Sequence, residues 1–148
     1  MIENLTLFIY KKHAEIGEFI LSLFMMSWGL WLLNPMWDTF SLPSFASFLL
    51  IASEVTWGIA ALTIGFLTFI FAGLRWYWAR RTLIFLNIVW WTFVAMMFLM
   101  AVPENTAVPV YMMLAVLSFW RYIKLVLIMQ MEKRFYEKPE NERRAVPR

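Results

Sequence analysis

Charged side chains stand inside otherwise apolar stretches of this sequence. Residues 117–130 read LSFWRYIKLVLIMQ and carry Arg121 and Lys124 three positions apart, a spacing that puts both on one face of a helix. Glu18 lies near the start of another apolar stretch. Ionisable groups in such surroundings pair with one another, extend to nearby water, or line a path or ligand site. These three interpretations are the possible roles of the charged side chains.

Composition identifies the class of protein that holds these charges. Of the 148 residues, 62% are hydrophobic and 19% are aromatic, well above the apolar share of soluble domains. The sequence therefore predicts an all-α, polytopic integral membrane protein with the lipid bilayer as its first partner. Cysteine is absent and histidine occurs once, which excludes disulfides, thiol catalysis and Cys-based or multi-His metal sites.

Four apolar runs are each long enough to cross the hydrocarbon layer as a helix. They predict a four-helix bundle with spans at residues 16–33, 54–74, 82–101 and 108–129. Pro35 and Pro103 follow the first and third runs and end them. For the second run a longer helix from residue 43 to 73 is an alternative, because Ser41 and Pro43 also resemble a helix start.

Two flanking segments complete the predicted chain. Before the first span, Leu5, Phe8 and Ile9 share one helical face, which predicts an N-terminal interfacial helix. Residues 133–148 mix both signs of charge and contain two prolines, a composition that predicts a solvated, partly disordered cytoplasmic tail. The transmembrane domain accordingly covers residues 1–132.

Lysine and arginine are distributed unevenly among the connections. The segments at 34–53 and 102–107 contain neither residue, whereas basic residues precede the first span, follow the fourth, and occupy the connection between the second and third at Arg75, Arg80 and Arg81. By the positive-inside rule both termini and this middle connection are cytoplasmic. We expect a bacterial inner (plasma) membrane location with this orientation.

Counting depth along each predicted helix at 1.5 Å per residue brings polar groups from all four spans to one level near the cytoplasmic boundary. This predicted intramembrane polar layer comprises Glu18, Ser22, Thr68, Asn87, Arg121 and Lys124. Three interpretations remain open: snorkelling of the two cations, a structural pair between Glu18 and Arg121 or Lys124, and a water-lined path or ligand site.

The second span carries two further candidate features. Gly58, Ala61 and Gly65 recur at spacings of three and four and predict a close helix-packing strip, within the bundle or between subunits. Glu54 stands at the outer end of this span. There it either contacts water or forms a cation-attracting outer mouth.

Motifs for catalysis are missing from the sequence. It contains no glycine loop for phosphates, no nucleophile elbow and no zinc-binding HExxH pattern, so we expect no enzyme, cofactor, metal or nucleic-acid partner. The favoured function is a small homo-oligomeric pore or ion channel, a permeabiliser of the holin or defence-effector kind. An accessory or assembly subunit of a larger membrane complex is the alternative, and a small proton-coupled transporter is third.

Overall fold

The computed structural model of this chain is helical throughout its described elements. It describes residues 2–36, 38–74 and 76–144, with side chains between residues 15 and 133 apart from positions 37 and 75. In chain order the elements are α1 (Ile2–Leu32), η1 (Thr39–Ser41), η2 (Pro43–Phe45), α2 (Ala46–Leu49), α3 (Glu54–Ala72), α4 (Tyr77–Ala101) and α5 (Ala107–Arg144).

Four of these helices contain stretches long and apolar enough to cross a membrane. The stretches are Glu15–Leu32 in α1, Glu54–Ala72 in α3, Tyr77–Ala101 in α4 and Ala107–Lys133 in α5. They confirm the four predicted apolar helices, although α4 begins five residues before the predicted start at residue 82. Arg80 and Arg81, expected in a connection, therefore belong to a helix.

The alternative of one long helix from residue 43 to 73 is wrong. Two short 3₁₀ turns and the four-residue α2 precede a non-helical break at residues 50–53. At the break, the hydroxyl of Ser53 accepts a hydrogen bond from the backbone N–H of Thr56 at 3.4 Å, and its extended backbone is that of a helix N-cap. A new helix therefore starts at Glu54.

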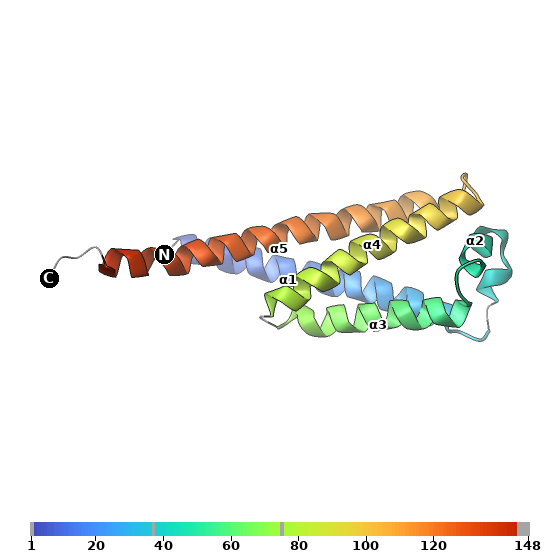
Figure 1. Ribbon diagram of the computed structural model, residues 1–148, viewed down its shortest axis with the longest axis horizontal. Coiled ribbons are helices and arrows are strands. Elements are labelled where there is room, and N and C mark those ends of the chain that lie inside the picture. Colours follow the sequence, from blue (N-terminus) through green and yellow to red (C-terminus); the bar gives the residue numbers. More distant parts are fainter. Residues whose placement is uncertain (1, 37, 75, 145–148) are drawn as a thin grey trace.

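The first and last helices are longer than the spans within them. α1 runs without interruption from Ile2, so the segment expected to form an interfacial helix is continuous with the first span, and its placement at an interface stays a prediction. α5 continues as a helix to Arg144, where the sequence favoured partial disorder. The start of α1 and the end of α5 lie at the same end of the bundle (Figure 1).

Helix packing is closest between α1 and α3 and between α4 and α5. Glycine allows the first of these contacts: a Cβ on Gly29 would lie 2.8 Å from the backbone nitrogen of Leu62 and 2.9 Å from the carbonyl oxygen of Gly58. A Cβ on Gly65 would lie 2.9 Å from the backbone nitrogen of Met26. The predicted strip, including the fully buried Ala61, thus faces α1 of the same chain.

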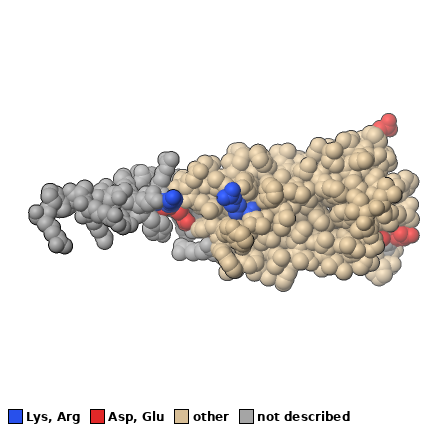
Figure 2. All heavy atoms as spheres, viewed as in Figure 1, with Lys and Arg blue, Asp and Glu red and all other residues tan. Residues whose placement is uncertain are grey.

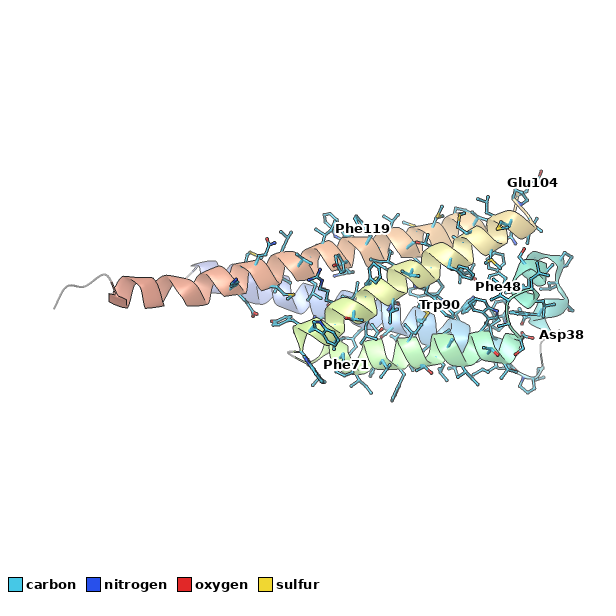
Figure 3. The ribbon with its side chains drawn as sticks, in the orientation of Figure 1. Asp38, Phe48, Phe71, Trp90, Glu104 and Phe119 are labelled. Atoms are coloured by element: carbon cyan, nitrogen blue, oxygen red, sulfur yellow. The ribbon has the colours of Figure 1, made fainter. Side chains whose placement is uncertain are left out.

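Aromatic side chains fill the bundle at the end opposite the chain termini. Trp28 of α1 donates a hydrogen bond from Nε1 to the Tyr111 hydroxyl of α5 at 3.0 Å, and the Trp91 ring of α4 stacks on Tyr111. Buried phenylalanines from the connection between α1 and α3 extend this core, with Phe48 against Trp57. Figure 3 labels Phe48 where α2 meets the bundle.

Charged side chains are concentrated toward the ends of the molecule. Figure 2 shows acidic atoms at one end, where Asp38 and Glu104 lie in the connections, and a broad surface without Asp, Glu, Lys or Arg beside them. Such an uncharged band is what a helix bundle exposes to lipid hydrocarbon.

Candidate functional site

A buried ion pair joins the first and third spans. The Arg80 guanidinium of α4 donates from Nε to Glu18 Oε2 at 2.9 Å and from Nη2 to Glu18 Oε1 at 2.7 Å. Both side chains are 2% exposed. Two parallel hydrogen bonds between a guanidinium and a carboxylate fix the orientation of both groups, so the pair sets the rotation of α1 relative to α4.

The periodicity of α4 explains why Arg80 points inward. Its buried side chains include Arg80, Ile84, Asn87, Trp91 and Val94, which recur every three or four residues and so share one helical face. The arginine extends this face by one turn toward the chain termini. It stands at the N-terminal turn of α4, close to the polar end of the bundle.

Arg80, a residue outside the predicted pairings, donates two hydrogen bonds to the Glu18 carboxylate. A pair between Glu18 and Arg121 or Lys124 was one of three interpretations of the sequence and stays a prediction. Arg121 is partly buried and its guanidinium lies against Gly17, where an added Cβ would overlap it. Lys124 Nζ lies 5.4 Å from the centre of the Trp120 ring. Neither cation is without a partner.

The uncharged members of the predicted layer are buried in the bundle. Ser22 donates to the Phe19 carbonyl at 2.7 Å. Asn87 Nδ2 donates to Thr68 Oγ1 at 3.0 Å, which links α4 to α3, and to the Leu83 carbonyl at 2.9 Å. The Oδ1 atom of Asn87 is buried without a hydrogen-bond partner among the described residues.

Sequence reasoning missed two members of this region. Arg80 was assigned to a connection because it stands beside Arg81 in a basic segment, yet it lies seven residues before Asn87 and so on the same helical face. Ser118 of α5 is fully buried and donates to the Leu114 carbonyl at 2.8 Å. Its position three residues before Arg121 was the signal for it.

Glu54, the candidate outer mouth, is the first residue of α3. A carboxylate there is favoured by the positive end of the helix dipole. Its side chain is partly buried, and Oε1 has no hydrogen-bond partner within the described part of the chain. The helix terminus is a favourable place for this charge, and the outer mouth stays a prediction.

No known protein family, curated protein or solved structure matches this chain. Within the described ranges, no group of three or more His, Cys, Asp or Glu side chains is placed to hold a metal ion.

The geometry favours docking of helices over exchange of charge. Glu18 and Arg80 neutralise each other inside the bundle, and the carboxylate oxygens are each engaged by the guanidinium. Asn87 and Thr68 connect a third helix to the same layer. Interhelical polar contacts of this kind specify which helix faces which in a membrane.

Proposed function

We propose that this chain is a non-enzymatic accessory or assembly subunit, which associates with other membrane proteins through its lipid-facing helix surfaces. The observation that carries the proposal is the enclosure of the Glu18–Arg80 pair, because charges that saturate each other inside a bundle hold helices together and are not presented to a permeating ion. The polar layer then keeps the four helices in register while their outer faces contact partners.

The outer faces of the spans support this proposal. Large exposed apolar side chains occur on all four spanning helices, among them Phe24, Phe66, Met96, Val116 and Phe119. Association of helices in lipid depends on van der Waals packing and on hydrogen bonds between helices. Such faces suit contacts with partner helices in the bilayer.

Crosslinking in native membranes tests the proposal. The chain contains no cysteine, so Val116→Cys provides a unique attachment site for a crosslinker on an exposed face of α5. Leu125→Cys provides a site at a fully buried position of the same helix and is the control. We expect a stoichiometric crosslink to one foreign membrane protein from position 116 and none from position 125. Crosslinks to copies of this chain alone would contradict the proposal.

A second candidate function is a homo-oligomeric pore. The small buried share of the spanning stretch of α5 favours it. This stretch is the least covered of the four, and Arg121 and Lys124 lie on it, both partly buried. Copies joined along α5 would bring several cations into one layer, an arrangement that selects anions. Planar-bilayer recordings would then show an anion-selective conductance that decreases in Lys124→Gln; absence of any conductance removes this candidate.

The location is part of the same proposal. We place the chain in a bacterial inner membrane with both termini in the cytoplasm, because the basic residues gather at the end of the bundle where α1 begins and α5 ends. The uncharged band between the two ends supports a position across the bilayer.

A further inference from the structure

The connection between α1 and α3 forms a cap over the end of the bundle opposite the termini (Figure 1). The cap, residues 38–52, has two apolar sides. Phe40, Phe45 and Phe48 are buried against the bundle, while large apolar side chains on the other side are exposed. These are Leu42, Leu49, Leu50 and Ile51, with Leu50 88% exposed.

We propose that the exposed side of the cap is a membrane-contact surface, whose apolar side chains insert among the lipids of the adjacent monolayer. Contiguous exposed apolar surface on a protein marks a contact with another protein or with a membrane. Lipid is the expected contact for three reasons: the depth of the cap in the membrane, its continuity with the exposed apolar surface of α3, and its low charge. It concerns a single chain and does not depend on the proposed assembly with partners.

Depth places the end of the cap at the membrane boundary. The 19 residues of α3 extend about 28 Å at 1.5 Å per residue, close to the roughly 30 Å thickness of the hydrocarbon core. Glu54 at the start of α3 then marks the boundary. Leu50 and Ile51 precede it by only three to four residues, so they lie at the level where acyl chains meet headgroups.

Continuity connects the exposed cap residues to a surface already facing lipid. Val55 and Ile59 are exposed on the first turns of α3, one helical turn apart. Ile51 precedes Val55 by four residues and is exposed as well. The exposed apolar residues of the cap thus directly precede those of α3 along the chain, and Glu54 is the one charged residue between Ile51 and Val55.

The cap has little charge that would favour contact with water. Residues 38–52 contain no lysine or arginine, and Asp38 is their one ionisable side chain. The polar residues of this segment are otherwise serines and a threonine. A segment with one charge and several large exposed apolar groups is more stable when those groups leave water for an apolar environment.

Buried contacts hold the exposed side in a fixed orientation. The rings of Phe40 and Phe45 stack with centres 5.2 Å apart, and Phe45 meets Phe98 of α4 edge to face at 4.9 Å. Trp57 Nε1 donates to the Phe48 carbonyl at 3.3 Å. Leu50 and its neighbours are thus presented by a cap packed on the bundle.

Spin labelling of single-cysteine variants in lipid vesicles tests the proposal, since the natural chain has no cysteine. The label is placed at Leu50→Cys, with Val55→Cys as the lipid reference and Glu104→Cys, exposed in the other connection at this end, as the aqueous reference. Collision rates with oxygen, which concentrates in lipid, and with a water-soluble nickel chelate are compared.

We expect the ratio of oxygen to nickel collisions at position 50 to match that at position 55 and to exceed that at position 104 several-fold. A ratio equal to that at position 104 would overturn the proposal in favour of water. Low collision rates with both reagents would also overturn it, because they indicate burial against protein. Ile51→Cys repeats the measurement at a second exposed position, so a variant that fails to fold does not decide the result.

Discussion

The Glu18–Arg80 pair removes two formal charges from contact with both water and lipid. Removing one partner of such a pair leaves the other charge buried and uncompensated, whereas replacing both by apolar groups of similar size is often neutral. Single and double replacements therefore distinguish a structural pair from two charges that are each solvated independently.

Glu18→Met or Arg80→Met alone should lower the free energy of unfolding in detergent by about 3–5 kcal/mol, because each leaves an unpaired buried charge. The double variant should recover most of this loss. The measurement is denaturant unfolding followed by circular dichroism. Arg81→Met is the matched control, since Arg81 is the exposed neighbour on the same helix; equal losses in the Arg80 and Arg81 variants would contradict the pair.

Depth along each predicted helix placed four polar side chains of three helices at one level. Glu18, Ser22, Thr68 and Asn87 lie buried in the bundle because each is polar within a long apolar run. The partner of Glu18 could not be obtained from depth, since three arginines and a lysine lie near the same level. Only the rotation of α4, which the face shared by Arg80 and Asn87 reveals, selects among them.

At the scale of elements, the contact between α1 and α3 depends on main-chain atoms that approach each other closely. The atoms nearest to a Cβ on Gly29 belong to the backbone of α3 and cannot rotate away as side chains do. Any side chain at this position therefore separates the two helices or shifts one along the other.

Gly29→Ala should lower the free energy of unfolding by about 1–3 kcal/mol, the usual cost of overpacking. Gly73→Ala is the control, because the nearest atom to its Cβ would be Phe19 Cζ at 3.9 Å, an ordinary contact distance. Thermal unfolding in one detergent compares the two variants. Equal melting temperatures of the two variants would contradict a close contact between α1 and α3 at Gly29.

The spacing of Gly58, Ala61 and Gly65 predicted a packing face on α3 but did not identify its partner. Gly29, the residue on α1 that this face approaches, has no small residue three or four positions away and therefore carries no recognisable small-residue pattern. The start of α4 differs from expectation for a related reason, whereas α3 starts at residue 54 as predicted and not at the alternative, residue 43. Capping by Ser53 and the inward face of Arg80 are local features that average hydropathy does not resolve.

Four helices of membrane-spanning length follow one another along the chain. Their connections therefore lie alternately at the two ends of the bundle. Apolar run length was sufficient to predict the number and order of these helices, because lipid requires every backbone polar group to be satisfied within a helix. The aromatic core of the cap depends on packing partners distant in sequence, such as Phe98 against Phe45, and run length does not encode them.

Reporter fusions should establish the orientation of the bundle. Fusions after residues 39, 77, 105 and 148 should report outside, inside, outside and inside, because basic residues are absent from the connections at 34–53 and 102–107 and concentrate on the cytoplasmic side. Alkaline phosphatase activity and fluorescent-protein fluorescence provide complementary readouts. An external signal at residue 77 would invert the orientation and the proposed cytoplasmic location of both termini.

Synthesis order gives the Glu18–Arg80 pair a consequence for membrane insertion. The two residues are separated by 62 positions, and a ribosome adds about 5–20 residues per second. The first span therefore exists for several seconds before its arginine is made. During that interval Glu18 lacks its Arg80 partner, and the bundle closes only when α4 arrives. Insertion of α1 and its final docking are consequently separate steps in the biogenesis of this protein.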